Sequence, residues 1–104
     1  MEYKVVVTSD AEEDLSNFLF YLIFVIRNPQ AAHNVNEDYL TTINLLKTVA
    51  GTMKIAESFS NDWVIYRKIS FRKHRYYMLY RIDDDTVFID HIFHELQFPD
   101  ISDD

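Results

Sequence analysis

Hydrophobic and polar residues alternate over residues 65–95, and this pattern predicts three consecutive antiparallel strands joined by two tight turns. We expect the first turn at Lys73-His74. The second turn should fall in the acidic run Asp83-Asp84-Asp85, because aspartate side chains readily hydrogen-bond the nearby backbone. The rest of the chain is expected to support this three-stranded sheet.

The expected register assigns the side chains of these strands to two faces of the sheet. The face toward the core carries Ile65, Ile69, Phe71, Tyr76, Met78, Tyr80, Ile82, Val87, Ile89, His91 and Phe93. Pairing sets Tyr66 opposite Arg81, Lys68 opposite Leu79, Ser70 opposite Tyr77, Arg72 opposite Arg75, Ile82 opposite Val87 and His94 opposite Arg75. His91 is therefore interpreted as a core histidine. A slip of one residue would move His94 to the apolar face, and we prefer the stated register because it buries more apolar side chains.

The opposite face of the sheet is expected to be basic. It gathers Lys68, Arg72, Arg75, Tyr77, Arg81 and His94. Six of the ten lysines and arginines lie between residues 67 and 81, in a chain whose formal net charge is −7. Cations concentrated against the overall charge predict a local anion site. The alternative is a solvated sheet face whose long cationic side chains keep the strands soluble.

The first half of the chain predicts a strand followed by two helices. Residues 3–8 read YKVVVT, a short β-branched segment typical of a strand. Ser9 and Glu12 have the spacing of a capping box, which predicts a helix from Ser9 to about Arg27. Asn28 as N-cap and Pro29 at the first helical position predict a second helix, which we expect to end at a C-terminal cap on Gly51.

The segments outside these elements are expected to be irregular. Residues 52–63 lack periodicity and predict a loop held to the core by Met53, Ile55, Phe59 and Trp63. From residue 96 onward the chain carries a proline and ends acidic, which predicts a mobile tail.

Composition predicts one domain spanning residues 1–104. The chain is 48% hydrophobic and 15% aromatic, enough for one compact core. It has no cysteine, which excludes disulfides and cysteine-based zinc sites, and its four dispersed histidines lack metal-ligand spacing. No signal peptide is recognisable, and the longest apolar run, residues 18–26, is about half the length that spans a bilayer. We therefore expect a cytoplasmic protein without membrane contact, metal or cofactor.

Three stretches of the sequence resemble the RelE/ParE toxin family. They are the NPQAA junction at residues 28–32, the strand pair YRKISFRKHRYYMLYRI, and the ending VFIDHIFHELQ at residues 87–97. Their order covers nearly the whole chain, and the resemblance implies an α+β fold with the element order β-α-α-β-β-β. It also implies a toxin of a type II toxin–antitoxin module that a cognate antitoxin holds inactive.

Within this family the RelE branch cleaves mRNA on the ribosome without a metal, whereas the ParE branch inhibits DNA gyrase. The resemblance favours mRNA cleavage, with Lys68 and Arg72 stabilising the phosphate and His94 as acid or base. Tyr77 would orient a ribose or base, and Arg75 and Arg81 would add phosphate contacts.

Two departures from the family pattern keep alternatives open. Tyr77 stands where RelE-type members usually carry an arginine, and Glu95 stands where another arginine is expected. The alternatives are a ParE-like gyrase inhibitor and a catalytically inactive protein that keeps the toxin fold as a binding module. A structural hydrogen-bonding role for His94 is the alternative to catalysis.

Overall fold

The computed structural model describes residues 2–97 and has an α+β architecture of one sheet and two long helices. The sheet contains β1 (Lys4–Val7), β2 (Tyr66–Ser70), β3 (Tyr76–Asp83) and β4 (Thr86–His94) in the order β1-β4-β3-β2. β1 runs parallel to β4, and the other neighbours are antiparallel. The predicted element order and fold class are confirmed.

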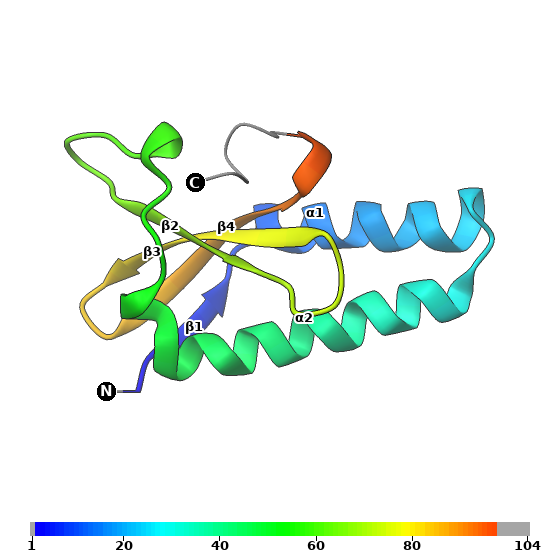
Figure 1. Cartoon of the computed structure of the whole chain (residues 1–104), viewed down its shortest axis with the longest axis horizontal. Helices are drawn as coiled ribbons and strands as arrows, with labels where there is room; N and C mark the ends of the chain where they lie inside the picture. Colours follow the sequence, from blue (N-terminus) through cyan, green and yellow to red (C-terminus); the bar gives the residue numbers. More distant parts are fainter. Residues whose placement is uncertain (1, 98–104) are drawn as a thin grey trace.

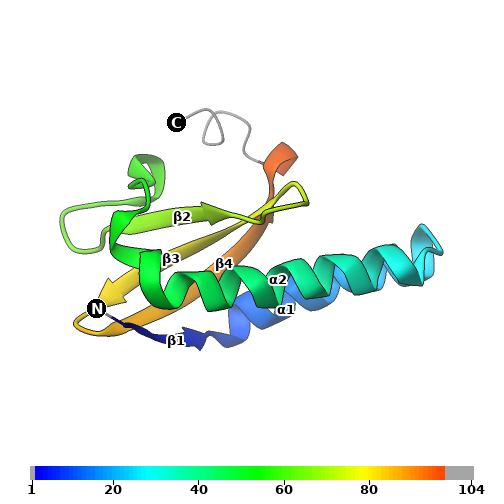
Figure 2. The same cartoon turned by 60° about the horizontal axis from the view of Figure 1, so that its bottom comes forward.

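Two helices cover one face of the sheet and extend beyond it, as Figures 1 and 2 show. α1 (Ser9–Phe20) continues without interruption into a single π-helical segment, η1 (Tyr21–Val25), and α2 (Pro29–Val49) returns antiparallel. Three short 3-10 turns complete the described chain: η2 (Ala50–Thr52), η3 (Glu57–Phe59) and η4 (Glu95–Gln97). Within residues 2–97 the helices lack the combined length and apolarity that crossing a membrane would need.

Of the three helix caps predicted from the sequence, one is confirmed. The Asn28 side chain accepts a hydrogen bond from the backbone N–H of Ala31 at 3.0 Å, which confirms the predicted N-cap of α2. The N-cap of α1 is Thr8 rather than Ser9, because the β1 strand ends one residue earlier than the capping-box pattern required. Gly51 has no positive φ and lies in η2, so the predicted glycine C-cap is wrong.

Two of the four residues predicted to anchor the loop before β2 contact the rest of the fold. Met53 packs against the core, and the ring of Phe59 stacks on Phe93 with centroids 5.6 Å apart. Trp63 is 92% exposed and Ile55 is also exposed, so these two were wrongly predicted as core contacts. The predicted tail begins within η4 and otherwise lies outside the described residues.

The predicted register of β2 and β3 is correct along the whole ladder. Tyr66 pairs with Arg81, Lys68 with Leu79 and Ser70 with Tyr77. The ladder stops before the predicted Arg72–Arg75 pair, and residues 72–75 form a bent loop closed by a 2.8 Å hydrogen bond from the Phe71 N–H to the Tyr76 carbonyl. The turn is therefore wider than the predicted turn at Lys73-His74.

The register of β3 and β4 is predicted correctly only as far as Ile89. Ile82 pairs with Val87 as expected, but a β-bulge at Asp90 shifts the register, so Leu79 faces His91 and Tyr76 faces His94. An extra residue in one strand reverses the faces of all side chains beyond it.

The bulge corrects three assignments in the second half of β4. His91 and Phe93 lie on the open face, away from the helices, whereas Ile92 is buried under the helices. His94, predicted on the basic face opposite Arg75, lies on the helix-covered side next to Tyr76. Ile65, also predicted in the core, precedes β2 and is exposed.

Candidate functional site

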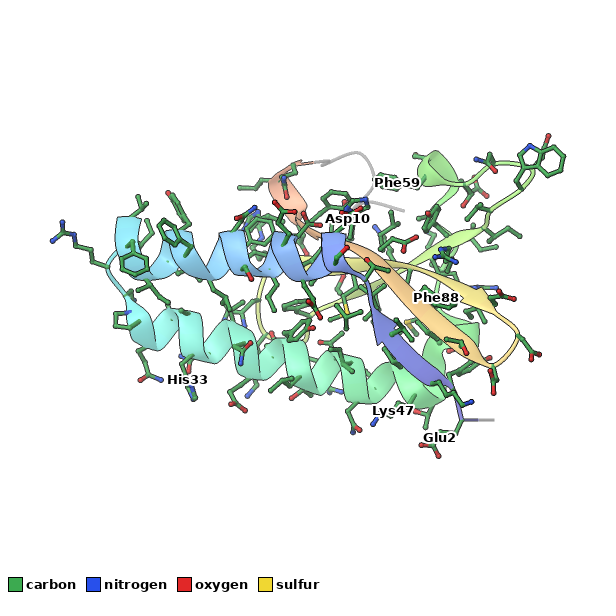
Figure 3. All side chains as sticks on the ribbon, turned by 180° about the vertical axis from the view of Figure 1, so that it is seen from behind. Glu2, Asp10, His33, Lys47, Phe59 and Phe88 are labelled. Atoms are coloured by element: carbon green, nitrogen blue, oxygen red, sulfur yellow. The ribbon has the colours of Figure 1, made fainter. Side chains whose placement is uncertain are left out.

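The open face of the sheet is the surface on which the sequence predicted an anion site. Figure 3 shows Phe59 on the side of the sheet away from α2, the helix that carries His33 and Lys47. The open face of β2, β3 and β4 carries Tyr66, Lys68, Ser70, Tyr77, Leu79, Arg81, Phe88, Asp90, His91 and Phe93. Of the six residues predicted to form the basic face, this surface contains Lys68, Tyr77 and Arg81.

Lys68 and Tyr77 are in contact, but Tyr77 is not available to a ligand. The Lys68 ammonium lies 5.5 Å from the centroid of the Tyr77 ring. Tyr77 is only 1% exposed, and its hydroxyl has no hydrogen-bond partner among the described residues. Burial, with a smaller contribution from the charge of Glu95, raises the pKa of this phenol. A stacking role for Tyr77 would therefore require its cover to move.

Arg81 is neutralised by Asp90, the residue at the bulge. Its Nε donates to the Asp90 carboxylate at 2.8 Å, and the Tyr66 hydroxyl donates to the same oxygen at 2.9 Å. The bond to Asp90 is the main reason that the pKa of Arg81 is raised. Burial first, and then the bond to Asp90, raise the pKa of Tyr66. The Arg81 guanidinium also lies 4.5 Å from the Phe88 ring centroid, so this cation is held on the sheet by two contacts.

Arg72 and Arg75 belong to the loop between β2 and β3 rather than to the open face. Arg75 donates to Glu95 at 3.0 Å, an ion pair at the far end of β4. Arg72 lines a groove against α2 together with Lys73 and His74. The predicted cations are thus divided among three places, because the ladder ends at Ser70 and the loop turns toward the helices.

A buried carboxylate on α2 fixes this basic loop. Asp38 accepts hydrogen bonds from the backbone N–H of Arg72 at 3.1 Å, from the N–H of Lys73 at 2.8 Å and from the His74 ring at 2.7 Å. Burial alone would raise the pKa of Asp38, but these three hydrogen bonds outweigh burial and lower it. The loop is therefore held against α2 by an ionised side chain, although sequence reasoning assigned Asp38 no role.

His94 lies in an apolar pocket on the helix side of the sheet. Its ring meets Tyr76 edge-on at 5.1 Å, and Phe18, Leu22 and Ile26 line the same pocket. His94 Nδ1 accepts a hydrogen bond from the backbone N–H of Leu96, at the start of η4. These contacts place the His94 ring on the helix side of the sheet, on the opposite face from Lys68.

His91 takes the place on the open face that the sequence assigned to His94. Its Nδ1 lies 3.1 Å from the Asp14 carboxylate of α1, and its ring stacks on Phe93 with centroids 5.4 Å apart and an interplanar angle of 19°. The same Asp14 oxygen accepts the backbone N–H of Ile92 at 3.0 Å. The side chain of His91 is 42% exposed.

The burial pattern of β4 reflects this arrangement. The buried residues of β4 are Val87, Ile89 and Ile92, so the apolar spacing changes from two to three across Asp90. An interval of three within an alternating strand is typical of a bulge. The partner of His91 has no local signal, because Asp14 lies 77 residues away in the sequence.

The helical hairpin presents an exposed apolar surface at the end that extends beyond the sheet. It comprises Phe20, Tyr21, Ile23, Phe24, Val25 and Ile26, each exposed. The rings of Phe20 and Phe24 contact each other, with centroids 4.6 Å apart. Contiguous exposed apolar side chains on a small protein commonly mark a protein–protein contact.

Among residues 2–97 there is no group of three acidic or histidine side chains suited to a metal ion.

No protein-family model and no curated protein matches the chain. Among solved structures, a chain from the chromosomal ParDE toxin–antitoxin system of P. aeruginosa matches with a TM-score of 0.73 at 17% identity, over 89% of this chain and 96% of that one. A chain of the RelBE2 toxin–antitoxin complex from Mycobacterium tuberculosis matches with a TM-score of 0.52 at 23% identity, over 90% of this chain and 99% of that one. With the strand order and the helical hairpin described above, these matches show that the chain has the RelE/ParE toxin fold.

Proposed function

We propose that this protein is the toxin component of a type II toxin–antitoxin module. The observation that carries the proposal is the match of its fold, over about nine-tenths of its length, to chains from two toxin–antitoxin systems. Because a shared fold does not by itself define an activity, the proposal also depends on surfaces of this chain.

The exposed apolar end of the hairpin supports an antitoxin as partner. Its six consecutive or near-consecutive apolar side chains lie beyond the sheet, where no described element of the chain covers them. The neighbouring pocket, lined by Phe18, Leu22, Tyr76 and His94, continues this surface toward the sheet. An amphipathic helix of an antitoxin can bury both surfaces, and helix-in-groove binding is a common mode of peptide recognition.

For its action on the cell, we propose mRNA cleavage on the ribosome at the open face of the sheet. Lys68 supplies a cation there, His91 is a partly exposed proton donor or acceptor, and Phe93 and Phe88 add aromatic surface. Cations beside aromatic rings suit single-stranded RNA, because they hold phosphates and stack on bases. The roles predicted for Arg72 and Arg75 then concern more distant phosphates, since both lie in the loop.

A second candidate function is inhibition of DNA gyrase by binding. It is favoured by the ion pairs that two of the predicted cations form with carboxylates. Arg75 and Arg81 are each matched by a carboxylate, and the chain has a net charge of −7. A toxin that acts by binding a protein does not need the concentrated positive charge that stabilises a cleavage transition state.

The decisive experiment is induction of the chain in bacteria, alone and together with the adjacent open reading frame. Growth arrest that the second reading frame relieves supports the toxin–antitoxin assignment, and absence of arrest contradicts it. New mRNA 5′ ends at defined codon positions support cleavage. Arrest with intact mRNA and inhibited supercoiling by purified gyrase supports the second candidate instead.

A further inference from the structure

We propose that His91, oriented by Asp14, is the catalytic base that removes the ribose 2′ proton in RNA cleavage. This inference rests on the proposed nuclease action and assigns its proton transfer to a residue pair that joins α1 to β4. Neither residue belongs to the site predicted from the sequence.

The orientation of the His91 ring is set by two contacts, each supported by a further residue. Asp14 Oδ2 is anchored by the backbone N–H of Ile92 at 3.0 Å, so the carboxylate has a defined position beside β4. The same oxygen lies 3.1 Å from His91 Nδ1. Phe93 stacks on the imidazole, and Phe59 stacks in turn on Phe93. One carboxylate and one aromatic ring thus hold the imidazole, and Ile92 and Phe59 in turn support these two groups.

This geometry selects a tautomer. An ionised carboxylate only accepts hydrogen bonds, so Nδ1 of a neutral His91 carries the proton that bonds to Asp14. The second nitrogen, Nε2, then has a lone pair and belongs to a side chain that is 42% exposed. An imidazole whose Nδ1–H is held by a carboxylate is oriented and ready to accept a proton at Nε2.

The surroundings of His91 place a cation within reach of the same substrate. Lys68, Leu79 and His91 are direct neighbours across β2, β3 and β4, on the open face. Two strand spacings separate the backbones of Lys68 and His91 by about 10 Å, a gap that their side chains narrow. Leu79 between them is buried and apolar. A phosphate that binds across the outer ends of the Lys68 and His91 side chains would lie between a cation and a base.

The bulge at Asp90 is what produces this row. Without the extra residue, His91 would face the helices and His94 would face the solvent, as the alternation predicted. The bulge therefore brings His91 to the open face and also supplies Asp90, which holds Arg81 and Tyr66 beside the row. β-bulges are frequent next to active sites for this reason.

The proposed step balances without a metal or cofactor. His91 Nε2 takes the proton of a ribose 2′-hydroxyl, O2′ forms a bond to the adjacent phosphorus, and the bond from phosphorus to O5′ breaks. Water protonates the departing O5′, and the hydroxide formed recovers the proton from His91. The products are a 2′,3′-cyclic phosphate and a 5′-hydroxyl end, while the Lys68 ammonium stabilises the charge on the phosphate.

The test uses purified full-length chain and ribosomes programmed with a defined mRNA. We expect His91→Gln to lower the single-turnover cleavage rate by about 10²-fold or more. Asp14→Ala should cause a smaller loss, because the base remains but its orientation is lost. The matched control is His33→Gln, an exposed histidine of α2, which should leave the rate unchanged. Circular dichroism and capture by the antitoxin verify that each variant is folded.

A spectroscopic measurement separates orientation from folding. The ¹⁵N shifts of the His91 ring should report protonated Nδ1 in the wild-type chain and loss of this preference in Asp14→Ala. If folded His91→Gln cleaves mRNA at the wild-type rate, the assignment is overturned. It is also overturned if, of the histidine variants, only His94→Gln loses cleavage activity. If the wild-type chain cuts no mRNA at all, the proposed nuclease function fails, and the assignment of His91 fails with it.

Discussion

The substitution Asp38→Ala tests whether one buried carboxylate holds the basic loop against α2. Asp38 is almost fully buried and accepts three hydrogen bonds, two from the backbone of residues 72–73 and one from His74. Removing it leaves these three donors without their acceptor. We expect the loop to detach and the protein to lose a substantial part of its stability.

The magnitude follows from the number and the exposure of these donors. A hydrogen bond to a charged group contributes about 1.5–3 kcal/mol to stability. Arg72 and Lys73 are exposed, so water can replace part of what their N–H groups lose. We therefore expect a total loss of about 3 kcal/mol rather than the full sum, against a typical stability of about 5–15 kcal/mol. The melting temperature should fall by roughly 15 °C.

The pH dependence provides a second measurement of the same interaction. The pKa of Asp38 is lowered in the folded state, so its carboxylate stabilises the fold at pH values above the unfolded-state pKa of about 3.9. This contribution is lost as the pH falls through the folded-state pKa. The difference in unfolding free energy between wild type and Asp38→Ala should be fully present at pH 7 and shrink below about pH 4.

The assay is urea unfolding monitored by circular dichroism at both pH values. Glu37→Ala is the matched control, because Glu37 is the preceding residue on α2, is exposed, and lies 4.0 Å from His33 in a solvent-screened pair. It should change the unfolding free energy by less than about 0.5 kcal/mol. A loss below about 1 kcal/mol for Asp38→Ala, or a loss equal to that of the control, would refute the reasoning.

Three further substitutions test other contacts. Tyr80→Phe removes the 2.7 Å hydrogen bond from a fully buried hydroxyl to the Ala50 carbonyl, and urea unfolding should report a loss of about 1 kcal/mol; an unchanged midpoint would contradict that bond. Trp63→Phe should leave stability within about 0.5 kcal/mol, and acrylamide should quench Trp63 almost equally in the folded and the unfolded chain. Phe24→Ser should leave the unfolding free energy nearly unchanged yet weaken antitoxin binding in titration calorimetry; unchanged affinity would exclude the hairpin end from the interface.

The sheet of residues 66–83 follows directly from the sequence, for a simple physical reason. Alternation places every second side chain of a strand on one face, and burial of Ile69, Met78 and Tyr80 under the helices allows only one register. The N-cap at Asn28 is equally local, because the side chain and the N–H that it accepts lie three residues apart. Such features depend on near neighbours, so a pattern is enough to predict them.

The bulge is the point at which the prediction of the site failed. Strict alternation through β4 assigned His94 to the open face, whereas the observed spacing of Val87, Ile89 and Ile92 inserts one residue at Asp90. The contact between His91 and Asp14 joins residues that are 77 positions apart in the sequence. The contacts between Asp38 and the 72–75 loop join residues at least 34 positions apart. No local pattern encodes such contacts, because they depend on how α1 and α2 pack on the sheet.

The parallel pairing of β1 with β4 has a consequence for the biosynthesis of the protein. Residues 4–7 pair with residues 86–89, so the first strand joins the sheet only after the chain has been synthesised as far as Ile89. Contacts between residues so far apart close late, because a long loop must first be ordered. A nascent chain therefore lacks a complete sheet until residues 86–89 have been synthesised and can pair with β1. Under the proposed function, this delay leaves an interval in which an antitoxin already present can bind the helical hairpin before the sheet is complete.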